Sequence, residues 1–264
     1  MKKSMVFAAA ALFLVQSNLC LAAPSECKEP GAPKGCFEKS AASVPMVLTP
    51  DPAFPIRPDI GELVANSPFF RLPSGDYAPF ESHSVKNDGK STSEDTTSLA
   101  RVAGSPLCRS SNDSISSTGN SSKWISKIEY LSWAGLIRLS SRTSQINQFA
   151  PSTSTTQVTR LDKLIGQPFP LKAGNTFSLE VTYENVMSYH KTPDKPEKVT
   201  TSASVGQYTC QVGATEPASV VQAGLKGSAT ALACTVTRQG SLSGTPVAYH
   251  WLDSVGCFVL TPKP

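Results

Sequence analysis

Alternation between apolar and polar residues is clearest in the C-terminal half of the chain. In the segment 176–183 every second residue from Phe177 to Tyr183 is apolar, and this period of two predicts a strand with one buried face. Clusters of β-branched and aromatic residues, separated by Gly and Pro, predict three further strands at 199–212, 229–238 and 247–251. With short connections and no long helical period, these strands favour a single antiparallel meander that forms a curved sheet.

In two segments the sequence pattern does not decide the secondary structure. Between 124 and 143 apolar and polar residues mix at short spacing, which predicts strands, but Trp124, Ile128, Leu131 and Gly135 also fit one face of a short helix. Residues 218–225 fit one or two turns of helix between strands.

The N-terminal part of the chain shows neither the period of two that is typical of strands nor the period that is typical of helices. Eleven of the 21 prolines lie between Pro24 and Pro79, where they disfavour helix and central strand. Apolar residues recur there, so this stretch is expected to be either disordered or an extended arm that packs its aromatics on a neighbouring domain. Residues 81–97 are polar and predict a linker, and 110–122 is a second loose stretch rich in Ser, Asn and Gly.

The first residues have the order of a secretory signal peptide. Lys2 and Lys3 precede an apolar run from Met5 to Val15, and small residues follow at the predicted cleavage site near Ala22. The run is too short for the roughly 20 residues that span a bilayer. A lipid anchor on Cys20 is disfavoured because Leu19 precedes it. The protein is thus expected to be periplasmic or secreted, without a mature transmembrane span.

These segments predict three parts. Residues 1–22 are the signal peptide, 23–97 a proline-rich or polar arm or linker that is largely irregular, and 98–264 one β-rich domain. The expected fold class is therefore mainly β, with an extended or disordered segment before the sheet.

The amino-acid composition limits the classes of partner that we expect the protein to bind. Only 17% of the residues are charged, and without the two signal lysines 22 basic residues face 20 acidic ones, a net charge of +2. We expect no nucleic-acid partner on these grounds, because a phosphate footprint needs clustered basic residues. An envelope protein, a glycan or an apolar ligand remains, and the oligomeric state is left open.

Six cysteines remain after signal removal, an even number that predicts three disulfides in an oxidising compartment. Cys27 and Cys36 close a short loop rich in Pro and Gly. Cys210 and Cys234 each lie inside a predicted strand, and neighbouring strands bring such residues within disulfide reach. Cys108 with Cys257 then follows by elimination. Cysteine and histidine spacing does not favour zinc, so neither a metal site nor a cofactor is expected.

Two phrases carry a resemblance. The strand run opens at residues 167–177, which contain the motif Phe169-Pro-Leu-x-x-Gly174. It closes at residues 249–259, which contain Trp251-Leu-x-x-x-Gly256, an example of the aromatic-Leu-x-x-x-Gly pattern. In this the chain resembles a loose group of exported bacterial β-rich proteins, over roughly its last 100 residues. The resemblance implies a sheet-rich envelope or secreted domain and no reaction.

Catalytic motifs are absent from the sequence. His250, Trp251 and Asp253, with Ser254 beside them, form the only cluster in which acid–base, aromatic and nucleophile types occur together. On a strand, His250 and Trp251 point to opposite faces. We therefore expect no catalytic residues and a non-catalytic protein that acts by binding. One alternative is an apolar-ligand carrier with a cavity between the Phe177 face and Trp133 or Trp251. A second is a hydrolase with an unidentified Ser/His/Asp site, which would show Ser or Asp bonded to a histidine in a cleft.

Overall fold

The computed structural model describes residue 48 and residues 51–87, 91–118, 122–146, 151–189, 197–238 and 244–261, all of which belong to one compact unit, 45–264. About 65% of the described residues are strand, in one sheet of eleven antiparallel strands that neighbour each other in chain order. The predicted mainly β fold with one curved meander is confirmed. The strands are β1 (Phe80–Asn87), β2 (Ser91–Arg101), β3 (Leu107–Thr118), β4 (Ser122–Trp133), β5 (Ile137–Ile146), β6 (Pro151–Ile165), β7 (Thr176–Tyr189), β8 (Lys198–Pro217), β9 (Ser228–Arg238), β10 (Thr245–Leu252) and β11 (Cys257–Leu260).

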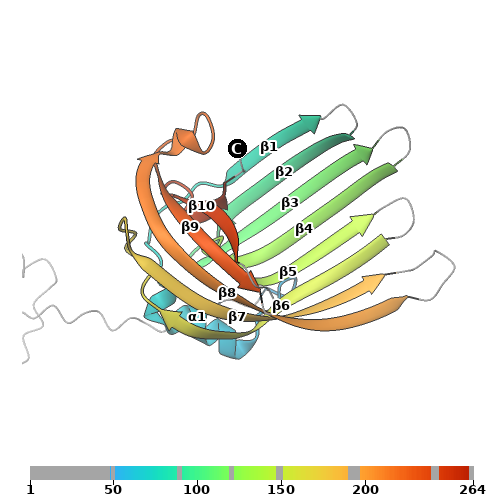
Figure 1. The fold of residues 1–264 in the computed structure, drawn as a ribbon, viewed down its shortest axis with the longest axis horizontal. Coiled ribbons are helices and arrows are strands. Elements are labelled where there is room, and N and C mark those ends of the chain that lie inside the picture. The colour runs from blue at the N-terminus through green and yellow to red at the C-terminus, as the bar shows by residue number, and fades with distance from the viewer. Residues whose placement is uncertain are drawn as a thin grey trace, which may run out of the picture. The chain divides into compact units, whose positions relative to one another are not determined.

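The sheet curls into a half-barrel (Figure 1). Strands β1–β6 form one wall, and β7–β10 turn across in front of it in this view. Two register shifts in β6, between Val158 and Arg160 and between Asp162 and Ile165, lie where the two walls meet. Such irregularities bend a strand and increase its local twist, which is what the curl requires.

A short helical segment packs against the sheet, where no helix is expected from the sequence. The helix α1 (Pro58–Asn66) begins with Pro58 at its first position, where the missing N–H of proline has no helical partner to lose. Ile60 and Val64 are its buried residues. The 3₁₀ turn η2 (Pro68–Phe70) follows directly, and the Ser67 hydroxyl accepts a hydrogen bond from Phe69 N. Proline density therefore misled the prediction, because a proline that opens a helix does not prevent it.

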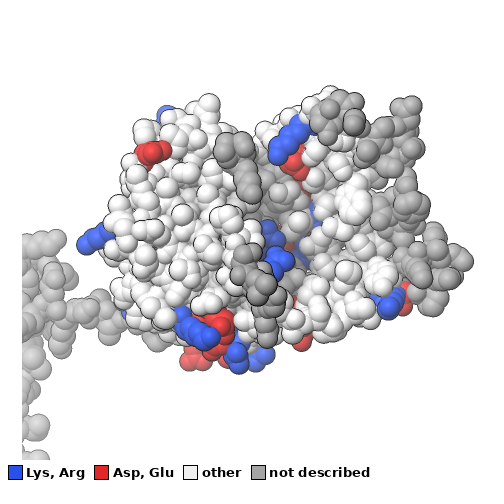
Figure 2. Space-filling view, in the orientation of Figure 1, with Lys and Arg blue, Asp and Glu red and all other residues white. Residues whose placement is uncertain are grey.

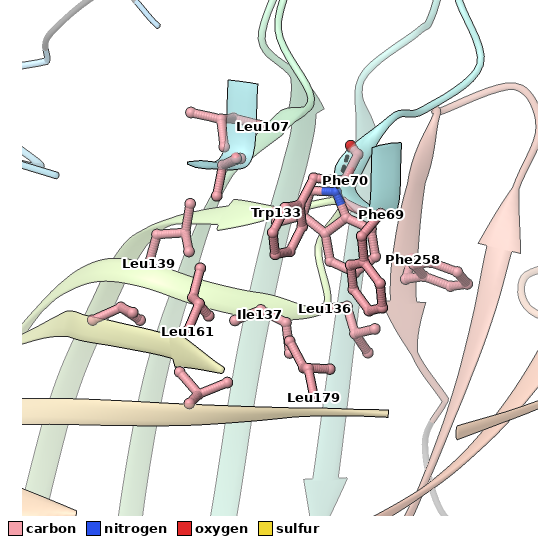
Figure 3. Packing of buried hydrophobic residues seen from close by; sticks show 14 of the residues in the cluster. Phe69, Phe70, Leu107, Trp133, Leu136, Ile137, Leu139, Leu161, Leu179 and Phe258 are labelled. Atoms are coloured by element: carbon pink, nitrogen blue, oxygen red, sulfur yellow. Dashed lines mark hydrogen bonds between the residues drawn. The ribbon is translucent and has the colours of Figure 1, made fainter. Parts of the chain in front are cut away.

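The centre of the core is an aromatic cluster between this segment and the sheet (Figure 3). Phe69 lies between Trp133 of β4 and Phe177 of β7, with ring centroids 5.9 and 6.0 Å away. Phe70 is fully buried, and its carbonyl accepts a hydrogen bond of 2.9 Å from the Trp133 indole. The segment before the sheet thus supplies part of the core, as an arm that lays its aromatics on the β domain.

The structure also corrects the prediction of a linker at residues 81–97 and of a loose stretch at 110–122. The expected linker forms most of β1 and β2, and the expected loose stretch forms most of β3. The four strands predicted in the C-terminal half correspond to β7–β10, and the open segment 124–135 is strand and turn instead of helix. β1 to β3 escaped detection because their outer halves are polar on both faces, so the apolar period that marks a half-buried strand is missing.

Two disulfides join the sheet, with the pairings expected from the sequence. Cys210 and Cys234 are register partners on β8 and β9, and Cys108 of β3 is bonded to Cys257 of β11 across 149 residues. Both indicate an oxidising, extracytoplasmic environment. The predicted Cys27–Cys36 bond and the signal peptide lie outside the described residues. Over the described part of the chain, no helix has the length and apolar character needed to cross a membrane.

Candidate functional site

The inner, concave face of the half-barrel carries rows of side chains that are mostly polar and uncharged. Register pairing aligns alternate residues of β2–β6 into two rows that run across the sheet. All ten are half-buried. One row is Asp95, Ser114, Ser126, Gln145 and Ser152, and the other is Thr97, Asn112, Ile128, Thr143 and Ser154. We call these two rows the hydroxyl rows.

Charged side chains of these strands lie mainly on the opposite face. Asp113, Lys127 and Arg142 alternate with the hydroxyl rows along β3, β4 and β5, and all three are exposed. Lys127 forms an ion pair of 3.3 Å with Glu129 on this outer face. Because successive residues of a strand point to opposite sides, most of the charge lies on the outer surface, and Asp95 and Arg138 are charged residues of the inner one. Asp95 is the only charged member of the hydroxyl rows.

Hydrogen bonds within the concave face orient its side chains. Asn112 Nδ2 donates to Thr97 Oγ1 at 3.3 Å, and Ser93 Oγ donates to Asp95 Oδ2 at 3.1 Å. A hydroxyl both donates and accepts, so each group that bonds its neighbour keeps further capacity for a ligand. The face is therefore an array of oriented donors and acceptors.

A group of tyrosines lies deeper in the half-barrel, toward the aromatic core. The hydroxyls of Tyr183 on β7 and Tyr208 on β8 are 3.0 Å apart. On the facing wall, the Arg138 guanidinium of β5 lies 4.5 Å from the centre of the Tyr130 ring of β4. Tyr249 of β10 is close enough to Tyr130, Tyr208 and Arg138 for their charges to act on its ionisation. We call these five residues the tyrosine group.

Burial sets the ionisation of the tyrosine group. It raises the pKa of Tyr249 to about 12, an effect that Tyr208 reinforces and the positive charge of Arg138 opposes. The pKa of Tyr183 is also raised well above its usual value, first by burial and then by Tyr208. These two phenols therefore remain neutral hydrogen-bonding groups at physiological pH.

The site is open to solvent on the side away from the core. Trp124 of β4 is 43% exposed and shares the concave side with Tyr130, because the two are six residues apart in an uninterrupted stretch of the strand. Figure 2 shows a hollow near the centre of the molecule, with basic side chains inside it. Neutral polar groups, an aromatic platform and an arginine thus line an accessible trough.

The cluster predicted from the sequence is not assembled into a catalytic site. His250 is half-buried, and its Nδ1 lies 2.8 Å from the Thr261 hydroxyl. Trp251 is buried against Phe169, with ring centroids 4.8 Å apart. Asp253 is exposed in the β10–β11 turn, where its carboxylate accepts a hydrogen bond from Ser228. His250 and Asp253 thus have different partners, whereas Phe169 and Trp251 bring the two phrases of the resemblance into contact.

The other described histidine is at the opposite edge of the sheet. His83 of β1 is exposed, with Nδ1 3.1 Å from Thr96 Oγ1 and Nε2 3.7 Å from a Glu94 carboxylate oxygen. His83 and His250 thus contact threonine and glutamate side chains, whereas the alternative hydrolase calls for Ser or Asp bonded to a histidine. In the segments that the structure describes, no group of three or more His, Cys, Asp or Glu side chains is placed to hold a metal ion.

Aromatic rings lie beside the residues between which the apolar-ligand alternative places its cavity. Phe69 occupies the space between Phe177 and Trp133, and Phe169 covers Trp251. The sequence pointed to the apolar strand faces and missed the hydroxyl rows, because Ser and Thr are common in loops as well as in strands. The alternation of Asn112 with Asp113, and of Ser126 with Lys127, is the signal that marks the neutral face.

Neither a family model nor a curated protein nor a solved structure matches the chain.

Proposed function

We propose that this is an exported, non-catalytic binding protein of the bacterial envelope or the secreted fraction, and that its concave face binds a neutral glycan chain. The two disulfides support the exported state, and the predicted signal peptide with cleavage near Ala22 agrees with it. The observation that carries the ligand class is the separation of charge between the two faces of β2–β6.

Sugar chemistry fits the hydroxyl rows. A neutral sugar presents hydroxyls that donate and accept, as do the side chains of Ser, Thr, Asn and Gln in the rows. Its apolar C–H faces suit an exposed aromatic ring, a role open to Trp124. A ligand pocket of this kind combines apolar surface with a few placed polar groups.

The same surface is unfavourable for two competing ligands. A hydrocarbon chain laid on the hydroxyl rows would remove polar groups from water without giving them hydrogen-bond partners, which costs about 1–3 kcal/mol for each group. A polyanion would meet Asp95 in the rows. These costs favour a neutral polar ligand over a lipid or a phosphate-rich chain.

Binding of maltohexaose, cellohexaose and chitohexaose, followed by calorimetry and tryptophan fluorescence, tests the proposal. At least one should bind, and Asn112→Ala should weaken it at least tenfold, whereas Asp113→Ala on the other face of the same strand should leave affinity unchanged. Trp124→Ala and Ile125→Ala form a second pair of this kind. Failure of all three sugars to bind at millimolar concentration, or equal effects of the paired variants, would overturn the proposal.

A further inference from the structure

A second hollow lies outside the concave face. It is a pocket of about 590 Å³ between the end of α1, the loop 71–77 and the β2–β3 turn. Its lining includes Phe70, Leu72, Val102 and Pro106, which give it an apolar wall. The volume is within the range of about 300–1,000 Å³ that is usual for small-ligand sites.

Arg101 is the basic residue that is drawn into this pocket. It is half-buried at the end of β2, and burial lowers its pKa to about 10. One of its nitrogens donates a 3.0 Å hydrogen bond to the carbonyl of Gly256, and the guanidinium lies 5.6 Å from the centre of the Tyr77 ring. None of the ion pairs found among the described residues involves Arg101.

The position of Tyr77 is fixed by three contacts. Its hydroxyl donates to the Pro73 carbonyl at 2.7 Å, and the N–H of the next residue, Ala78, donates to the Ser254 carbonyl at 2.9 Å. Its ring lies so close to Gly256 that a Cβ there would be 2.6 Å from ring carbons. The wall of the pocket beside Arg101 is therefore held in place without a ligand, which reduces the ordering cost of binding.

Arg101 has more hydrogen-bond donors than the Gly256 carbonyl can accept from it. A guanidinium presents five N–H donors in a planar fork that matches a carboxylate, and the Gly256 carbonyl accepts one hydrogen bond. Removing a charge from water is costly when it is not compensated by an opposite charge. The carboxylate of Asp76 lies on the exposed side of the pocket, and the ion pairs found do not join it to Arg101.

We infer that this pocket binds a small amphiphile with a carboxylate head, which pairs with Arg101 while its hydrocarbon body lies on Leu72 and Val102. This site is separate from the concave face and does not depend on the proposed glycan binding. The ligand class follows from the combination of one unpaired cation with an apolar wall.

Calorimetric titration with decanoate tests the inference, with decanol and acetate as controls that each lack one half of the ligand. Decanoate should bind at least tenfold more tightly than either control. Arg101→Gln should weaken decanoate at least tenfold, whereas Arg71→Gln, which removes an exposed arginine at the same pocket, should change affinity less than threefold. Asp76→Asn should strengthen binding, because it removes a repulsive carboxylate.

A second variant keeps Arg101, so that the pocket can still be tested if Arg101→Gln fails to fold. Ala65→Trp fills the pocket from α1 and should abolish decanoate binding while circular dichroism and the unfolding midpoint stay near wild type. Decanoate affinity that is unchanged in a folded Ala65→Trp or Arg101→Gln protein would overturn the inference. Equal affinities for decanoate and decanol would do the same, since the head group would then play no part.

Discussion

Phe258 N donates a hydrogen bond of 2.6 Å to the carbonyl of Ala134, so the last strand of the sheet is bonded to the turn between β4 and β5. Gly135, the next residue, lies under the same strand with φ +80°, and a Cβ at this position would be 2.3 Å from the Phe258 carbonyl oxygen. The curl of the sheet therefore requires glycine here.

Gly135→Ala should destabilise the protein by about 3 kcal/mol, from backbone strain together with the clash against Phe258. Gly104→Ala is the matched control, because Gly104 also has a positive φ of +65° but nothing lies within 4 Å of the added Cβ. It should cost about 1 kcal/mol. Urea unfolding of both variants measures the difference, and equal losses would show that the close approach to Phe258 is not limiting.

Phe69→Ala should destabilise the fold by about 3–5 kcal/mol, because it leaves a cavity between Trp133 and Phe177. Ile165→Ala removes a large apolar side chain that is 63% exposed, and should cost about 0.5 kcal/mol or less. Denaturant midpoints and m-values measured together distinguish a stability change from a changed unfolded state. A loss at Phe69 as small as that at Ile165 would contradict the packing of the arm into the core.

The two disulfides should differ in their contribution to stability. Replacing both Cys108 and Cys257 by Ala opens a loop of 149 residues, whereas the Cys210 and Cys234 pair closes only 24. The chain-entropy relation gives losses of about 5 and about 3.5 kcal/mol respectively. Thermal unfolding of the two double variants should therefore rank the Cys108–Cys257 variant as the less stable, and the opposite ranking would contradict the entropic account.

Alkaline pH should destabilise the protein through Tyr249. Its folded pKa of about 12 is above the unfolded value of about 10, so between these pH values the unfolded state has released a proton that the folded state retains. Stability is fully present below pH 10 and falls as the pH rises to 12, by up to about 2.7 kcal/mol from this residue. Tyr183, with its raised pKa, acts in the same direction.

Urea unfolding of wild type and Tyr249→Phe at pH 9, 10, 11 and 12 measures this effect. The variant should show a shallower decline above pH 10, since phenylalanine has no proton to lose. Parallel declines in the two proteins would contradict the assignment to Tyr249.

The parts of the fold that were predictable are those with an apolar face. β7 is visible in the sequence because Phe177, Leu179 and Val181 are buried every second residue. β2 and β3 are not, because the curl places polar residues such as Asn112 on a concave surface that stays in contact with water. Period-two hydrophobicity reports burial, and a strand without a buried face gives no such signal.

Disulfide pairing was predictable to different degrees for a related reason. Cys210 and Cys234 lie in strands that are adjacent in sequence, so local pattern brings them together. Cys108 and Cys257 meet only because the whole sheet curls, which no local pattern encodes. The candidate site shares this property, since Tyr130 and Tyr249 come from strands that lie six places apart in the sheet.

The bond between Cys108 and Cys257 also sets an order of events during biosynthesis. Cys257 is the last cysteine of the chain, so the Cys108 thiol has no native partner until 149 further residues have been synthesised and exported. The Cys210–Cys234 bond can form as soon as one hairpin has emerged. The Cys108–Cys257 bond can therefore form only after the Cys210 and Cys234 thiols have both been exported, and until then Cys108 must be kept from pairing with either of them.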